Sequence, residues 1–173
     1  MSRHRPERQS PNPGSQRAVV TRTMAGLTRA LDWFDNSLQN VLASRGFEPV
    51  HRTQSMIIMH VAMGMTAPAD IARDMGLTRQ NVHHMAKPLI ERGVIESIRD
   101  PRDPRRSQFR LSETASELRH AALETLEALE WVLEMRIGQQ RAAQLRDALD
   151  ADWGRAVSSQ QELDADLQRQ REL

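Results

Sequence analysis

Residues 67–112 read APADIARDMGLTRQNVHHMAKPLIERGVIESIRDPRDPRRSQFRLS, and this stretch decides the fold. It opens on a short helix, because Pro68 suits a first helical position, where no N–H is needed. Ile71, Ala72 and Met75 then follow at helical spacing on one face. Gly76 ends this helix, since glycine adopts a sharply turning backbone with positive φ at little cost. The pattern therefore predicts one short helix and a tight turn.

The second helix of the stretch begins after Thr78, whose hydroxyl can cap its first turn. Its apolar side chains recur at the 3.6-residue period: Val82, Met85, Leu89 and Ile90. Gly93 ends it. A small residue, Ala72, stands where two helices cross closely, and Gly76 stands where the chain must turn. This spacing fits a DNA-reading helix-turn-helix better than a generic helical hairpin.

Two β-prone runs come next, with Val94, Ile95 and Ile98 in the first and Phe109 and Leu111 in the second. Between them, residues 99–106 read RDPRDPRR, whose prolines and aspartates favour a loop. The arginines of this loop, with Arg110 just beyond, make a positive hairpin tip, although the whole chain carries a formal net charge of only +1. Two helices, a glycine turn and a basic hairpin in this order predict a winged helix-turn-helix.

The hairpin closely resembles the wing of the multiple-antibiotic-resistance regulator (MarR) family of bacterial repressors. That wing carries an Asp-x-Arg-Asp-x-Arg pattern, matched here by Asp100, Arg102, Asp103 and Arg105. The family's Leu-Thr-Glu start to the next helix corresponds to residues 111–113, Leu-Ser-Glu, and the resemblance covers about residues 18–157. It implies a homodimer that binds a palindromic operator in double-stranded DNA. It also implies repression of nearby genes that ends when a small aromatic or phenolic ligand binds.

The resemblance places the second helix in a major groove and the wing along the neighbouring minor groove. With the apolar side inward, the helix turns Gln80, His84 and Lys87 outward, flanked by Asn81 and His83. Glutamine and asparagine can pair with adenine, and lysine with guanine or phosphate. A merely solvated polar face is the alternative, but such a face rarely lacks acids, and here none occurs before Glu91.

Thr78 and Arg79, at the helix start, are placed to meet a phosphate at the positive end of the helix dipole. Pro88 departs from the family, which more often has a polar residue there, and a proline inside a helix usually kinks it. The expected DNA-binding residues are Thr78, Arg79, Gln80, Asn81, His83, His84, Lys87, Arg99, Arg102, Asp103, Arg105 and Arg106.

The sequence predicts a mainly α fold with one MarR-like domain over residues 17–157. The winged helix-turn-helix takes about residues 52–112, including a helix over 53–63, and longer helices flank it at about 18–45 and 113–157. Gly138 interrupts the second flanking region. Residues 1–16, rich in Pro, Arg, Ser and Gln, are expected to be a disordered tail, and residues 158–173 a frayed or disordered extension.

Both flanking regions carry apolar seams. From Val20 to Val41, apolar residues recur at alternating steps of four and three. The last predicted helix carries a second apolar stripe at i, i+4 steps, formed by Leu145, Leu149, Trp153 and Val157. A homodimer in which both ends of two chains interlock would bury these seams and form a dimerisation region. An intramolecular helical hairpin stays open as the alternative, because heptads alone do not distinguish the two.

The composition bounds the class of protein. No apolar run approaches the ~18 to 20 residues that span a bilayer, and residues 1–16 lack the apolar core of a signal peptide. We therefore expect a cytoplasmic protein without membrane contact. The chain has no cysteine, which excludes a thiol switch and cysteine-bound zinc.

Catalytic motifs are missing as well. The sequence has no Gly-rich phosphate loop, no Gly-x-Ser-x-Gly turn and no His-Glu-x-x-His. His83 and His84 diverge by about 100° on a helix, so one ion cannot easily bind both. His120 and Glu124 share a helix face but need a third metal ligand, from His51 or His60 across the fold. We expect no enzyme, no cofactor and no metal site; a metal-responsive regulator is an alternative.

A ligand pocket would be lined by Trp33, His51, Arg52, Met59, His60 and Met63. Arg52 or His51 can pair with a carboxylate above an apolar floor. The Met and Trp side chains also suit plain core. A ligand-independent, DNA-organising factor is a further alternative. A winged-helix module that docks protein would need an uncharged or acidic wing, which this chain lacks.

Overall fold

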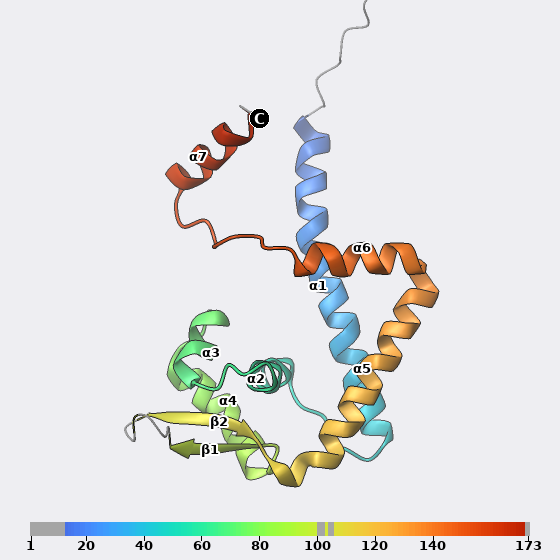
Figure 1. The fold of residues 1–173 in the computed structure, drawn as a ribbon, viewed down its shortest axis with the longest axis vertical. Coiled ribbons are helices and arrows are strands. Elements are labelled where there is room, and N and C mark those ends of the chain that lie inside the picture. The colour runs from blue at the N-terminus through green and yellow to red at the C-terminus, as the bar shows by residue number, and fades with distance from the viewer. Residues whose placement is uncertain (1–12, 100–102, 104–105, 172–173) are drawn as a thin grey trace, which may run out of the picture. The chain divides into compact units, whose positions relative to one another are not determined.

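The computed structural model describes residues 13–99, 103 and 106–171 (Figure 1). These residues fall into two compact units, which divide between Trp131 and Val132. The first unit contains α1 (Pro13–Ser44), α2 (Arg52–Ala62), α3 (Pro68–Asp74), α4 (Arg79–Glu91), β1 (Ile95–Arg99), β2 (Ser107–Leu111), the short 3-10 helix η1 (Glu113–Ala115) and most of α5 (Ser116–Ile137). The second contains the end of α5, α6 (Gln139–Asp150) and α7 (Gln160–Arg171). The predicted mainly α fold with a small β-hairpin is confirmed.

The winged helix-turn-helix is built around one apolar core. Side chains from α2, α3, α4 and the hairpin meet there: Ile57, Val61, Ile71, Ala72, Val82, Ala86, Leu89, Val94, Ile95 and Phe109. The predicted inward stripe of α4 is confirmed at Val82 and Leu89, which are fully buried, whereas Ile90 is partly exposed. Ile95 pairs with Leu111 and Ser97 with Phe109 in the antiparallel β1–β2 hairpin. The backbone N–H of Phe109 also donates to the Thr66 carbonyl at 2.8 Å, tying the hairpin to the chain before α3.

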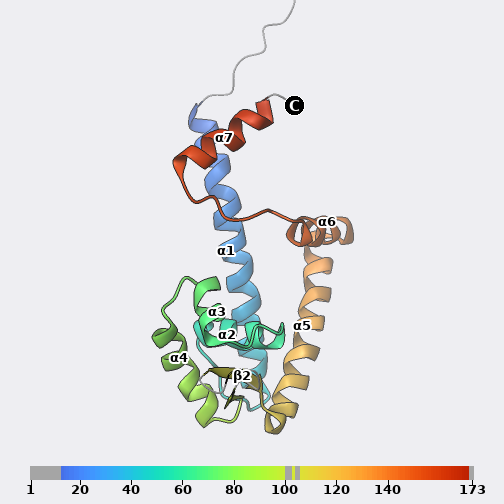
Figure 2. The same ribbon diagram turned by 60° about the vertical axis from the view of Figure 1, so that its left-hand side comes forward.

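Helix α2 connects this core to α1. It lies between the α3–α4 pair and α1 in Figure 1 and crosses in front of α1 in Figure 2. The side-chain amide of Gln39 on α1 donates to the Ser55 hydroxyl at 3.1 Å, and its carbonyl accepts the N–H of Val50 at 2.9 Å. One glutamine therefore holds both α2 and the segment that leads into it.

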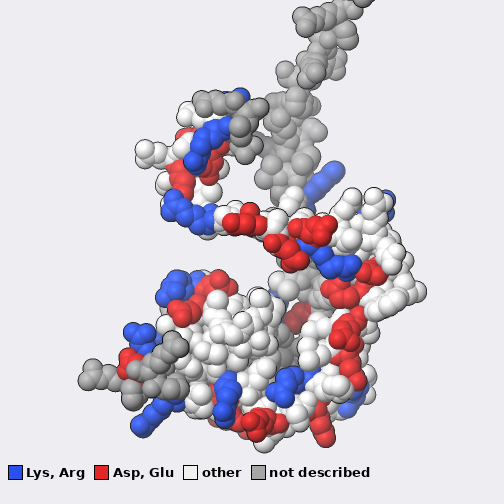
Figure 3. Space-filling model, viewed as in Figure 1, with Lys and Arg blue, Asp and Glu red and all other residues white. Residues whose placement is uncertain are grey.

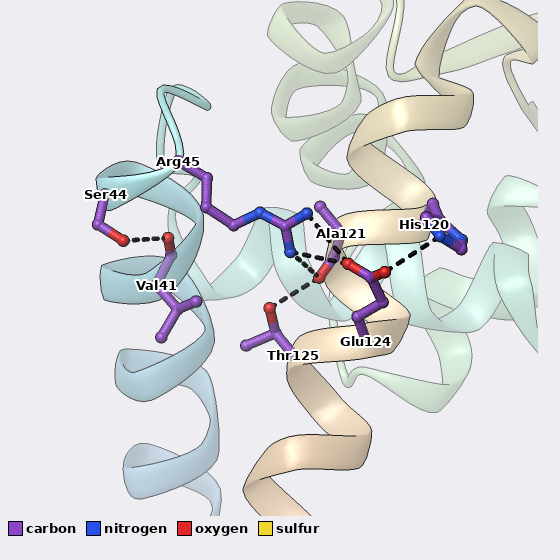
Figure 4. Close-up of polar contacts among 7 residues, drawn as sticks. All are labelled: Val41, Ser44, Arg45, His120, Ala121, Glu124 and Thr125. Carbon is purple, nitrogen blue, oxygen red and sulfur yellow. Dashed lines mark hydrogen bonds and ion pairs between the residues drawn. The ribbon is translucent and has the colours of Figure 1, made fainter.

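The end of α1 also binds the start of α5, although the two lie far apart in the sequence (Figure 4). The Arg45 guanidinium donates two bonds of 3.0 Å to one carboxylate oxygen of Glu124, and a longer one of 3.4 Å to the Ala121 carbonyl. That carbonyl also accepts the Thr125 hydroxyl at 2.7 Å. These contacts join the two helices that flank the winged helix-turn-helix in sequence.

Two helix boundaries differ from the prediction. Helix α1 begins at Pro13 and not near residue 18, so only residues 1–12 of the expected tail lie outside the described part of the chain. Helix α6 ends at Asp150, because Ala151 is extended and the Asp152 carboxylate accepts the Gly154 N–H at 2.7 Å in a turn. Trp153 and Val157 therefore lie beyond the helix and do not continue its apolar stripe.

The extension expected to be frayed or disordered is also different, because residues 160–171 form α7. The Ser159 hydroxyl accepts the Glu162 N–H at 3.2 Å, and the Glu162 carboxylate accepts the Ser158 N–H at 2.9 Å. A serine followed three residues later by glutamate is a helix-start signal, and the prediction overlooked it. Among the described residues, no helix is long and apolar enough to cross a membrane.

Candidate nucleic-acid interface

A short glycine turn sets the direction of α4. Gly76 has a φ of +64°, and the N–H of Leu77 bonds back to the Ala72 carbonyl at 2.8 Å, which closes the end of α3. The Thr78 hydroxyl accepts the N–H of Asn81 at 3.2 Å and caps the first turn of α4. The predicted turn at Gly76 and the predicted cap at Thr78 are therefore confirmed.

The outer face of α4 is polar and accessible. Gln80, Asn81, His84 and Lys87 are all exposed, as are Thr78 and Arg79 at the helix start. Lys87 approaches Glu91 on the next turn at 3.7 Å, an exposed pair that leaves its ammonium group in contact with water. Amides, an imidazole and cations thus form one surface above the buried stripe.

His83 differs from its neighbours because it is half-buried. Its ring packs edge-on against Phe109 of β2, with centroids 5.7 Å apart and planes at 75°. Burial lowers the pKa of His83, and the nearby Arg79 charge lowers it further. The ring is therefore a contact between α4 and the hairpin, which the helical wheel did not reveal because its partner comes from another element.

Helix α4 continues through Pro88 to Glu91. Proline has no N–H to donate to the carbonyl of His84, one turn earlier, and its ring is exposed on the helix surface. The exposed polar residues named above all precede it in sequence.

The hairpin brings further cations beside α4. Arg99 ends β1 opposite Ser107, and its side chain is exposed. Arg106 is also exposed, with its Nε 3.2 Å from the Asp103 carboxylate. Arg102 and Arg105, also predicted to contact DNA, lie outside the described residues. Figure 3 shows basic side chains beside the tip of the hairpin and acidic ones along α5.

Arg110 does not belong to that tip. It stands in β2 opposite Glu96 of β1, and its guanidinium donates to the Glu96 carboxylate at 2.5 Å. This bond lowers the pKa of Glu96, with the Ser112 hydroxyl donating to the same carboxylate, and it raises the pKa of Arg110. The pair links the two strands and neutralises the arginine charge locally.

Four of the six predicted ligand-pocket residues make other contacts. The Trp33 ring packs edge-on against Phe34, Arg52 forms an ion pair with Asp32, and the His51 N–H is bonded to Gln54 at 3.0 Å at the start of α2. Met59 and Met63 are exposed. His60 is buried, between Met56 and Asp74.

A pocket of about 480 Å³ lies elsewhere in the first unit. It is lined by Phe47, Glu48, Arg92, Gly93, Val94, Thr114, Ala115, Glu117 and Leu118. Arg92 is already engaged there, donating to the Glu48 carbonyl at 2.5 Å and pairing with the Glu48 carboxylate at 3.2 Å. None of the residues predicted to bind a ligand lines this pocket.

The spacing of His120 and Glu124 produces a pair, at 3.1 Å, but no third metal ligand joins it. The second carboxylate oxygen of Glu124 is occupied by Arg45 (Figure 4). Within the described part of the chain, no three His, Cys, Asp or Glu side chains are grouped to hold a metal ion.

Comparison with known proteins shows which solved structures have a similar fold. No family model and no curated protein matches the sequence. Among solved structures, a MarR-family transcriptional regulator from Rhodococcus sp. RHA1 aligns with a TM-score of 0.56 at 18% identity, covering 81% of this chain and 94% of that one. The chain has the MarR winged-helix fold.

Two further structures with this fold are similar. The transcriptional regulator BldR from Sulfolobus solfataricus aligns with a TM-score of 0.56 at 16% identity, over 81% of this chain and 96% of that chain. CouR from Rhodococcus jostii RHA1, solved bound to p-coumaroyl-CoA, aligns with a TM-score of 0.56 at 21% identity, over 76% and 92% of the chains. The MarR fold thus spans most of this chain, while sequence identity to these regulators is low.

Proposed function

We propose that the protein is a sequence-specific, DNA-binding transcriptional regulator. The observation that carries the proposal is the exposed polar face of α4, with amide, imidazole and ammonium groups before any acid, next to exposed arginines of the hairpin. A helix with this surface fits the major groove, where amide side chains can pair with adenine and cations with guanine or phosphate. The hairpin arginines add phosphate and minor-groove contacts that favour any DNA sequence.

We also propose that the protein acts as a homodimer on a palindromic operator. Along α1, Met24 is 70% exposed and Leu31 39%, and α5 exposes Leu123 and Trp131. Large apolar side chains exposed on both helices favour an interaction site there. Two copies related by a two-fold axis would present two α4 helices to half-sites one or two helical turns apart.

Repression that is released by a small aromatic or phenolic ligand is the regulatory mode we favour. CouR, which shares the fold, was solved bound to p-coumaroyl-CoA, and this supports small-molecule control here. A ligand-independent DNA-organising factor is the second candidate. A screen of aromatic acids and their thioesters for release of operator DNA separates the two, because the second candidate responds to none. We propose no enzymatic activity and no cofactor.

The function is tested by comparing two variants on a selected operator and on random DNA. Gln80→Ala should cost about 1 to 3 kcal/mol of binding free energy on the operator alone, since a base contact is lost. Arg99→Ala should weaken binding to both DNAs by the same factor and reduce the salt dependence of binding by about one charge. Fluorescence anisotropy at several salt concentrations measures both effects.

Matched controls come from α6, where Gln144 and Arg141 are also exposed on a helix. Gln144→Ala and Arg141→Ala should leave both affinities unchanged. If Gln80→Ala and Arg99→Ala lose equal affinity on operator and random DNA, α4 does not read bases and the proposed division of labour is wrong.

A further inference from the structure

His60, on α2, is a buried imidazole with an acceptor at each ring nitrogen. Only 6% of the residue is exposed. Its Nδ1 lies 2.6 Å from the Met56 carbonyl oxygen, and its Nε2 lies 2.7 Å from a carboxylate oxygen of Asp74. A neutral imidazole has one N–H and one lone pair, so it can satisfy only one of these two acceptors. The imidazolium, with two N–H groups, satisfies both.

The contacts of the His60 ring also favour its protonated form. Burial opposes the charge, but the hydrogen bonds to Asp74 and Met56 and the negative charge of Asp74 together raise the pKa of His60 above its ordinary value. On α3, Asp70 and Arg73 pair with each other at 3.0 Å. Asp74 supplies the charge that raises this pKa.

Asp74 lies at the end of α3, so its contact with His60 joins α2 to the helix-turn-helix. Asp74 is the last residue of α3, and two residues later Gly76 turns the chain toward α4. Helix α2 also bonds α4 directly, through the Gln54 amide to the Met85 carbonyl at 3.3 Å. The His60–Asp74 contact therefore joins α2 to the end of α3 just before the turn that aims the proposed reading helix.

We propose that His60 and Asp74 form a proton-dependent clamp that holds the helix-turn-helix in its DNA-binding geometry. This inference rests on the proposed function and adds a regulation to it. The clamp is complete when His60 is protonated, below its ordinary pKa of 6.5. It is lost as the pH rises through the raised value, because one ring nitrogen then turns a lone pair toward an oxygen. Operator affinity falls with it.

The first experiment follows the His60 ring proton by NMR in the whole protein, with His60→Gln used to assign the signal. His60 is expected to titrate above pH 6.5 in the wild type and at lower pH in Asp74→Asn. Titration of wild-type His60 at or below the ordinary value would overturn the clamp. This arm requires no DNA.

The second experiment measures operator affinity from about pH 6 to about pH 8.5 at constant ionic strength, the range in which histidines lose their charge. The wild type should lose about five-fold in affinity, the lower end of common couplings between two sites. Asp74→Asn should lose most of this dependence. An Asp74→Asn profile that matches the wild type would refute the clamp.

His84→Gln is the control, because His84 is an exposed histidine on the proposed DNA-binding face. It should lower the affinity but keep the His60-dependent part of the pH profile. A flat profile in His84→Gln would assign the pH effect to His84 and overturn the proposal. If no operator is bound at any pH, the proposed function fails, and the NMR titration still decides whether the proton-dependent contact exists.

Discussion

Gly76 occupies a backbone conformation with a φ of +64°, and a Cβ atom placed there would meet nothing within 4 Å. Its substitution therefore tests backbone strain without crowding. Gly76→Ala should lower the free energy of unfolding by about 1 to 2 kcal/mol, and Gly76→Asn by less, because asparagine tolerates the left-handed region. Urea denaturation followed by circular dichroism measures both.

Gly93 provides the comparison, because its φ of +68° is similar but a Cβ atom would lie 3.3 Å from the Thr114 hydroxyl. Gly93→Ala should therefore cost at least as much as Gly76→Ala. A Gly76→Ala variant as stable as the wild type would mean that the turn relaxes without strain.

Most of the exposed and buried positions of α4 could be predicted, because they depend on helical periodicity and on the cap at Thr78, but Ile90 is more exposed than expected. The roles of His60 and His83 could not. Each depends on a partner from another element, Asp74 for the first and Phe109 for the second, and periodicity contains no information about such pairs.

At the scale of elements, those with a local sequence signal could be predicted, and those that depend on distant contacts could not. The hairpin was predictable because two β-prone runs bracket a proline-rich loop. The end of α6 depends on a turn at residues 152–154, and the start of α7 depends on the capping Ser159. Apolar spacing alone predicts neither of them. The pairing of α1 with α5 through Arg45 has no local signal at all.

The Arg45–Glu124 pair between α1 and α5 is more than one-third exposed on both sides. A double-mutant cycle with Arg45→Gln and Glu124→Gln should therefore show a coupling of only about 0.2 to 1 kcal/mol, reduced further by high salt. Thermal unfolding of the four proteins measures it. A larger coupling that persists in high salt would show that the pair becomes buried when the protein assembles.

At the scale of the whole molecule, the exposed apolar seam on α1 predicts that a charge introduced there disrupts assembly. Leu31→Asp should dissociate the proposed homodimer, because burying leucine contributes about 1.5 to 3 kcal/mol and burying an unpaired carboxylate costs more. Light scattering should then report a species near the 19.7 kDa of one chain. Operator affinity should fall as well, since one half-site loses the second set of contacts.

Leu163→Asp is the matched control, because Leu163 on α7 is 40% exposed, nearly the same as Leu31. It should leave the mass and the affinity unchanged. A wild-type protein that is monomeric at micromolar concentration and still holds a palindromic operator tightly would rule out the proposed assembly.

The exposed methionine on α1 has a chemical consequence. The chain has nine methionines and no cysteine, so all of its sulfur is present as thioether. Met24, Met63 and Met135 are among the most exposed apolar side chains, whereas Met65, Met75 and Met85 pack against the core. Peroxide will therefore form sulfoxides first at exposed sites such as Met63 and Met135. Met24 is open to peroxide while the seam is uncovered, in a single copy, and a polar S=O group there would enter the apolar seam. Methionine sulfoxide reductase reverses this change, so damage to the seam by oxidants is repairable.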